Sequence, residues 1–327
     1  MTTKTLVAGI SIALTALAEP AIAAQGPSSS APSYLLSTDP QHTIFTSLLT
    51  TGDSIGGYRM AGIPDGLGAF DNGDGTFTVL MNHEIVANLG NVRAHGAKGA
   101  FVSEFVIDKA TLSVLSGRDL IQNVFGWDTA TQSLNTTTST IAFTRFCSAD
   151  LAPVAAFYNK ASGLGSQERI FMNGEEGGPT GFQVGTVVTG KDAGNAYILG
   201  KFNAQLNGSN QTGVPAWENA LANPFAQDKT IVIANSDTGT GVHNNALALY
   251  VGTKTNTGTE VDKAGLTNGT LKFVHVDGVA SEIADTTTRA TSIVSGTRFA
   301  LTASDMTQFS RPEDGAWSLD GDRKSVV

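Results

Sequence analysis

Five short polar stretches of this sequence combine residue types that can bind a metal ion or an anion. Four of them place a glutamate at or just after the end of an apolar segment, where it would project from the rim of a sheet. Carboxylate oxygens suit hard cations such as calcium, and a thiolate suits a transition metal. One sulfur and several carboxylates therefore predict a mixed metal site. The stretches are Asn82-His83-Glu84, Arg145-Phe146-Cys147-Ser148, residues 173–178, Ala216-Trp217-Glu218-Asn219 and Arg311-Pro312-Glu313-Asp314-Gly315.

Each stretch also has a purely structural interpretation. The pair Glu175-Glu176, followed by two glycines, would otherwise be a solvated turn. His83 could be a hydrogen-bonded histidine within a strand, and residues 311–314 could begin a helix with acidic residues facing its dipole. Cys147 could be a small buried core residue. We expect structural roles for three histidines that lack neighbours at metal-ligand spacing, namely His95, His243 and His275.

Short strands and tight turns must position these residues. The strand-like segments are rich in β-branched and aromatic residues and are bounded by Gly, Asn or Asp. Asn-Gly and Asp-Gly pairs, as in 71–75, 268–269 and 277–278, favour tight turns because glycine accepts positive φ. Helical periodicity is scarce, and 148–159 is the best short helix candidate. The predicted strands are 76–83, 99–108, 169–176, 196–202, 229–237, 246–253 and 270–278.

This pattern predicts an all-β fold. Many short strands with glycine-rich turns are typical of a sandwich, a barrel or a propeller. The sequence has no repeat of fixed period that would choose among the three.

The charge composition excludes one class of binding partner. The formal net charge is −9, and no cluster of Lys and Arg stands out, so nucleic acid is not expected as a partner. Cys147 is the only cysteine, so the chain has no internal disulfide to stabilise it.

The N-terminus predicts export. Lys4 precedes the apolar run from Leu6 to Ala18, and small residues follow Pro20, as in a signal peptide cleaved after Ala23. The alternative, a membrane anchor, needs about 20 apolar residues, and this run is shorter. We expect residues 1–23 to be the signal peptide, 24–42 a flexible lead-in, and the mature chain to contain no membrane span.

The order of the polar stretches resembles the secreted calcium-dependent alkaline phosphatase family known as PhoX and the wider group of PhoX-like bacterial proteins. The resemblance runs from about Thr46 to Asp320. The Asn-His-Glu and Arg-Pro-Glu-Asp-Gly pieces are its most specific carriers. The other carriers are GIPDGLGAF (62–70), VLMNHE (79–84), RFCS (145–148), FMNGEEGG (171–178) and AWEN (216–219).

The resemblance implies a β-propeller, six-bladed in the full-length family, with an iron and calcium cluster at one mouth. It implies that Cys147 and Glu84 ligate iron and that Arg311 clamps the phosphate of a small phosphate ester. It further implies a periplasmic or extracellular bacterial enzyme, which we expect to be a monomer. The remaining implied ligands of iron or calcium are Glu175 or Glu176, Glu218, Glu313 and, with weaker support, Asp237.

The sequence departs from the best-characterised branch beside two of these ligands. Ser148-Ala149-Asp150-Leu151 replaces a glycine-rich segment after Cys147, and Gly174 replaces a cysteine before Glu175. Two alternatives to a phosphatase therefore stay open. One is a non-catalytic calcium-binding propeller that acts as a scaffold or interaction protein. The other is a calcium-dependent lactonase, which would need neither a thiolate ligand nor a phosphate clamp.

The C-terminus also bears on the fold. PhoX-like chains continue well beyond the Arg-Pro-Glu-Asp-Gly motif, whereas this sequence ends within a dozen residues of it. Residues 322–327, DRKSVV, can be encoded by a DNA sequence that resembles a common sequencing adapter. We therefore expect a propeller domain over 43–321 that is incomplete at its C-terminal end, followed by a non-native tail.

Overall fold

The computed structural model describes residues 24–39, 41–177, 181–203, 213–214, 216–237, 240–241, 245–282, 293–294, 296–318 and 325–326. The predicted signal peptide, His243 and most of the predicted tail lie outside these ranges. Strands dominate the described residues, and the only helices there are short, so the predicted all-β class is confirmed. No helix among the described residues is long and apolar enough to cross a membrane.

Three larger sheets make up the body of the protein. The first sheet has the order β5 (Pro64–Asp71), β6 (Thr76–His83), β7 (Phe101–Asp108) and β8 (Val114–Asp119). The second sheet has the order β10 (Ser133–Thr138), β9 (Asn123–Asp128), β16 (Asn195–Ile198), β15 (Gln183–Val187), β14 (Ile170–Glu175) and β11 (Phe146–Asp150). The third sheet has the order β18 (Trp217–Ala222), β19 (Lys229–Ser236), β21 (Leu247–Thr253), β22 (Thr270–Val276) and β23 (Phe299–Thr302).

Neighbouring strands in these sheets are antiparallel, except that β9 runs parallel to β16. Short two-stranded pairs complete the strands: β1 (Ala24–Gln25) with β2 (Thr46–Ser47), β3 (Ser54–Ile55) with β4 (Tyr58–Arg59), β12 (Tyr158–Asn159) with β13 (Leu164–Gly165), β17 (Gly213–Val214) with β20 (Thr240–Gly241), and β24 (Ala316–Trp317) with β25 (Ser325–Val326). The helices are α1 (Val154–Phe157), α2 (Glu260–Lys263) and the 3₁₀ turn η1 (Gly200–Phe202).

Six of the seven predicted strands are found with small shifts of their ends, whereas 196–202 is a strand only as far as Ile198, where β16 ends, and its last three residues form η1. Residues 76–83 form β6 as expected, and 229–237, 246–253 and 270–278 correspond to β19, β21 and β22. The helix expected over 148–159 is wrong for most of its length, because β11 continues to Asp150 and only the four residues of α1 are helical. Residues of the predicted lead-in include β1, which pairs in parallel with β2.

Two hydrophobic clusters hold the three sheets together. Leu80 and Val102 of the first sheet pack with Phe171 and Val184 of the second in one cluster. On the other face of the second sheet, residues such as Met172 pack with side chains of the third sheet. Because successive side chains of a strand point to opposite faces, Phe171 and Met172 join different clusters. The second sheet therefore lies between the other two.

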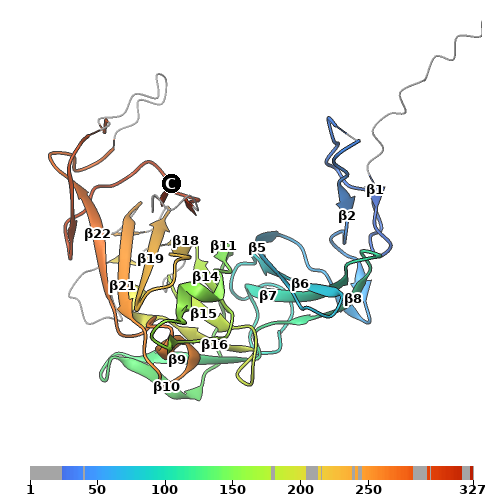
Figure 1. The fold of residues 1–327 in the computed structure, drawn as a ribbon, viewed down its shortest axis with the longest axis horizontal. Coiled ribbons are helices and arrows are strands. Elements are labelled where there is room, and N and C mark those ends of the chain that lie inside the picture. Colours follow the sequence, from blue (N-terminus) through green and yellow to red (C-terminus); the bar gives the residue numbers. More distant parts are fainter. Residues whose placement is uncertain are drawn as a thin grey trace, which may run out of the picture.

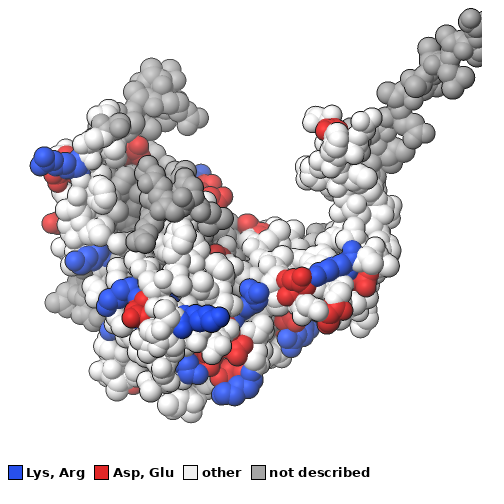
Figure 2. Space-filling view, in the orientation of Figure 1, with Lys and Arg blue, Asp and Glu red and all other residues white. Residues whose placement is uncertain are grey.

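The three sheets follow one another along an open arc, with β8 near one end and β22 at the other (Figure 1). Strands β5, β11 and β18 lie on the inner side of this arc. Each is the edge strand of its own sheet, and β11 contacts both β5 and β18. On the face shown in Figure 2, Lys and Arg are interspersed with Asp and Glu.

Candidate metal centre

Glycines allow β5 to approach β11 closely, and β14 to approach β18. A Cβ on Gly66 of β5 would lie 2.5 Å from the backbone nitrogen of Ala149 and 2.7 Å from the carbonyl oxygen of Cys147, both in β11. A Cβ on Gly174 of β14 would lie 2.4 Å from the carbonyl oxygen of Trp217 in β18. Real Cβ atoms do not approach backbone this closely, so the strand contacts require glycine at both positions.

Each inner strand carries one extra residue relative to its neighbour. Three steps along β5, from Pro64 to Leu67, oppose two steps along β6. The same surplus occurs in β11 between Phe146 and Ala149, and in β18 between Trp217 and Asn219. Such β-bulges re-aim side chains and are common beside functional sites.

The three bulges contain three of the acidic or sulfur-bearing residues of the site. Asp65 lies in the bulge of β5, Cys147 in that of β11, and Glu218 in that of β18. The bulges therefore direct these side chains toward the space between the inner strands.

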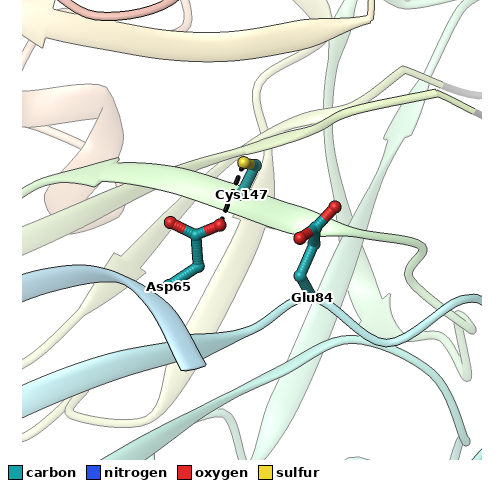
Figure 3. A group of neighbouring side chains, drawn as sticks. All are labelled: Asp65, Glu84 and Cys147. Atoms are coloured by element: carbon teal, nitrogen blue, oxygen red, sulfur yellow. Dashed lines mark hydrogen bonds between the residues drawn. The ribbon is translucent and has the colours of Figure 1, made fainter. Parts of the chain in front are cut away.

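Cys147 belongs to two groups of potential metal ligands. In one, ligand atoms of Asp65, Glu84 and Cys147 all lie within 4.8 Å of one another, and in the other the same holds for Cys147, Glu176 and Glu218. Figure 3 shows the first group, with the Cys147 sulfur hydrogen-bonded to the Asp65 carboxylate at 3.1 Å and Glu84 beside them. We call Cys147 and these four carboxylates the inner-strand cluster.

Buried amides fix the backbone at Cys147. The Asn82 amide nitrogen donates to the carbonyl oxygens of Cys147, at 2.8 Å, and Ser148, at 3.1 Å. The Asn173 amide in turn donates to the side-chain oxygen of Asn82, and both amides are almost fully buried. A buried, bonded pair of this kind holds the β11 bulge in one conformation.

Arg145 links two carboxylates of the inner-strand cluster. One of its terminal nitrogens lies 2.8 Å from Glu84 and 2.5 Å from Glu176, and its Nε donates to Glu84. Its backbone has a φ of 49°, a region that non-glycine residues rarely occupy. Residues in this region are often found at functional sites, where the surrounding structure maintains the strain.

Burial disfavours charge on several members of the cluster. Desolvation, followed by hydrogen bonds to Glu218 and Asp65, raises the pKa of the Cys147 thiol far above its usual range. Desolvation also raises the pKa of Glu176 to about 7, although Arg145 opposes the shift. The pKa of Glu218 is raised by desolvation as well. A cation among these groups would favour their ionised forms and release protons on binding.

Arg311 lies outside the two ligand groups and is already paired. Its Nε and one terminal nitrogen contact the buried carboxylate of Asp237, the closest distance being 2.6 Å, and the same terminal nitrogen lies 3.0 Å from Glu313. These contacts, the hydrogen bond to Asp237 first, raise the pKa of Arg311. Its side chain is 62% exposed, and its φ of 54° is again positive.

The segment from Arg311 to Trp317 is anchored to β19 and β18 of the third sheet. The Asn235 amide donates to the carbonyl oxygen of Glu313, and the Trp317 indole donates to that of Leu221 in β18. Asp314 lies within hydrogen-bond distance, 3.2 Å, of the Ser148 hydroxyl, which also lies 3.1 Å from Glu218. No helix begins at 311–314, so the structural alternative for this stretch is wrong.

The two glutamates of the Glu175-Glu176 pair have different environments. Glu175 is fully buried, and its carboxylate accepts hydrogen bonds from the backbone nitrogens of Thr144 and Phe182. Glu176 points into the inner-strand cluster and is also buried. The solvated-turn interpretation of this pair is therefore wrong, and Glu176 rather than Glu175 lies among the grouped ligand atoms.

The structure thus brings together Glu84, Cys147, Glu176 and Glu218 from the predicted set. It places Glu313 and Asp237 with Arg311 instead. His83 is the buried strand histidine of the alternative reading, because its ring bonds the carbonyl of Gly62 and the hydroxyl of Ser103.

Sequence reasoning missed Asp65 as a member of the site, and it named Arg145 and Ser148 only as neighbours of Cys147, without a role of their own. Asp65 lies in the quoted GIPDGLGAF stretch, where Pro64 and Gly66 flank it. Proline and glycine inside a strand pattern mark an edge, a bulge or a close backbone approach, and that signal could have pointed to Asp65. Comparisons with protein-family models, with curated proteins and with solved structures return no match.

Proposed function

We propose that this chain is an exported, metal-dependent phosphomonoesterase of the PhoX-like type, with iron and calcium held at the inner-strand cluster. The observation that carries the proposal is the position of Cys147, whose sulfur belongs to two groups of carboxylates at once. Without a cation, half-buried and buried acidic groups this close together repel one another and are costly to ionise.

Within the all-β class, the architecture that we propose is a β-propeller. Its blades are antiparallel sheets whose inner strands surround a common axis. The packing of the sheets in succession, with edge strand β11 in contact with edge strands β5 and β18, supports this arrangement. The ligand groups then lie where metal sites are expected on such a fold, between the inner strands.

The need for bound cations follows from the charges of the substrate and of the site. A phosphate ester is an anion, and the four carboxylates of the inner-strand cluster would repel it when they are ionised. Bound cations would reverse the local field, polarise the phosphoryl oxygens and stabilise the leaving oxygen. The protein's own contribution is to fix the ligands through the bulges and the Asn82 amide, and to hold Arg145 and Arg311 at the rim.

Arg311 suits the role of phosphate clamp. Its contacts use Nε and one terminal nitrogen, and within the described part of the chain no hydrogen bond or ion pair uses Nη1. A guanidinium anchored on one side by a carboxylate can present its free edge to phosphate oxygens.

A second candidate, a non-catalytic calcium-binding scaffold, is favoured by the same arginine. Arg311 is already neutralised by Asp237 and Glu313, so a phosphate ester would have to compete with Glu313 for it. Calcium-dependent stability in a protein that binds no iron would support this candidate.

The test is release of phosphate from p-nitrophenyl phosphate at alkaline pH by the full-length purified protein, with calcium and iron supplied. Turnover that disappears with a chelator and returns with the metals is expected. If the metal-loaded protein binds calcium but releases no phosphate, the phosphatase proposal is wrong, and the calcium-binding scaffold is the candidate that stands.

A further inference from the structure

A cavity of about 220 Å³ lies beside the first sheet and contains two arginines. It is formed by the β3–β4 hairpin, the segment after β4 and the loop that joins β6 to β7. Arg59, Arg93, Asn91 and Thr51 supply its polar side chains, and no carboxylate lines it. None of its residues belongs to the inner-strand cluster.

Arg93 is held rigidly in the wall of this cavity. Its guanidinium lies 3.2 Å from the centre of the Phe101 ring, and Nη2 forms an ion pair with Asp119 at 3.3 Å. Nε and Nη2 are enclosed and make no hydrogen bond. Nη1 is not enclosed in this way, so it is the nitrogen that can meet a ligand. Stacking on an aromatic ring removes much of the entropy that a free arginine loses on binding.

The charge of Asp119 is shared by several donors. Besides the ion pair with Arg93, it accepts hydrogen bonds from the Tyr58 hydroxyl at 2.8 Å and the Ala94 backbone nitrogen at 2.9 Å. Asp119 is not among the residues that line the cavity, so it orients the Arg93 guanidinium from the side away from the cavity.

Arg59 supplies a second positive charge, which, unlike that of Arg93, is not balanced by a carboxylate. It is exposed, and among the described residues it forms no ion pair. The carboxylate of Asp53, on the same hairpin, already accepts hydrogen bonds from the backbone nitrogens of Ser30 and Thr50. In a chain with a net charge of −9, two arginines and no acid in one cavity form a local positive site.

We propose that this cavity binds a small oxyanion of the phosphate or carboxylate class. Guanidinium groups recognise such oxygens through paired N–H donors, and Asn91 and Thr51 add neutral donors around them. The cavity has room for the anion and several waters, at about 30 Å³ per water. This inference does not rest on the proposed function.

Isothermal titration calorimetry with inorganic phosphate tests the proposal. The full-length protein is used in low-salt buffer after removal of metals with EDTA, so that phosphate cannot bind through a cation at the inner-strand cluster. We expect saturable binding with one site per chain, and Arg59→Ala should weaken it about tenfold or more. A parallel titration with acetate identifies which of the two oxyanion classes the cavity prefers.

The matched control is Arg118→Ala. Arg118, in β8 of the first sheet, is exposed like Arg59, but it pairs with Glu104 at 2.8 Å and does not line the cavity. The control should bind like the wild type. Absence of saturable binding for both anions up to about 10 mM, or equal binding by wild type and Arg59→Ala, would overturn the proposal. Circular dichroism and melting of Arg59→Ala check that the variant is folded.

Discussion

The sulfur of Cys147 donates a hydrogen bond to the carboxylate of Asp65 across the gap between β11 and β5, at 3.1 Å. Two residues 82 positions apart in the sequence thus meet at the edges of two different sheets. The pairing identifies Asp65 as a candidate ligand beside the thiol, and it connects the chemistry of the site to the packing of the strands.

Replacing Cys147 tests the ligand role. Cys147→Ala should weaken metal binding about 10- to 100-fold, because it removes the one atom shared by both ligand groups. The metal content per chain, measured by plasma mass spectrometry after dialysis, gives the result. Asp65→Asn, which keeps the shape but loses the charge, should cause a smaller loss. Retention of the full iron content by Cys147→Ala would contradict the role assigned to the thiol.

Arg311 separates substrate binding from metal binding. Arg311→Ala should lower kcat/KM for p-nitrophenyl phosphate by a factor on the order of 10²–10³ while metal content stays unchanged, since the arginine lies outside both ligand groups. Arg298→Ala, at an exposed arginine directly before β23, serves as the control. A variant that loses metals together with activity would show instead that Arg311 supports the cluster through Asp237.

Gly66→Ala tests whether the close approach of β5 and β11 is essential. The new methyl group would meet backbone atoms of Ala149 and Cys147, which cannot rotate away, so the strands must separate. We expect a loss of about 1–3 kcal/mol in the free energy of unfolding, together with weaker metal binding. Urea denaturation measures the stability. In Gly62→Ala, where the nearest atom to the new Cβ is 3.7 Å away, stability should change little. Equal stability of the two variants would argue against a tight contact.

Asp150 should make the stability depend on pH. Desolvation raises the pKa of this carboxyl from 3.8 to about 6, although the backbone nitrogen of Ala222 donates to it. Because the raised pKa means that the folded protein holds the proton more tightly, stability falls as pH rises from about 4 to 6 and then levels off. The loss attributable to this group is about 2–3 kcal/mol.

Asp150→Asn removes that titration. Urea denaturation at several pH values should show the variant gaining stability relative to the wild type as pH rises through this window. A constant difference between the two proteins from pH 4 to pH 7 would contradict the assignment.

The local sequence pattern predicted most strands well, and it failed where tertiary contacts determine the secondary structure. Alternating apolar residues and Asn-Gly or Asp-Gly turns located β6, β19, β21 and β22, because a half-buried strand needs that alternation. The apolar stretch after Cys147 suggested a helix, but the contacts of β11 with β14 keep 146–150 extended. Pairing with a neighbouring strand overrides weak helical periodicity.

The site was predictable in its residue types but not in its geometry. The sequence places Glu84 and Glu218 near strand ends, yet nothing local shows that both would reach Cys147. The bulges that turn Asp65 and Glu218 inward depend on the register with β6 and β19, which is a property of strand pairs. For the same reason the sequence could not tell that Glu175 faces backbone nitrogens whereas Glu176 faces the cluster.

The bulges of β5, β11 and β18 also bear on solubility. All three strands are sheet edges, and an open edge is a template onto which a strand of another molecule can add. A bulge with an inward-pointing charged or polar group interrupts the row of backbone donors and acceptors that such an addition requires. The residues that we assign to metal binding therefore also protect the inner edges against aggregation, so variants that neutralise them should be judged by their association state as well as by their metal content.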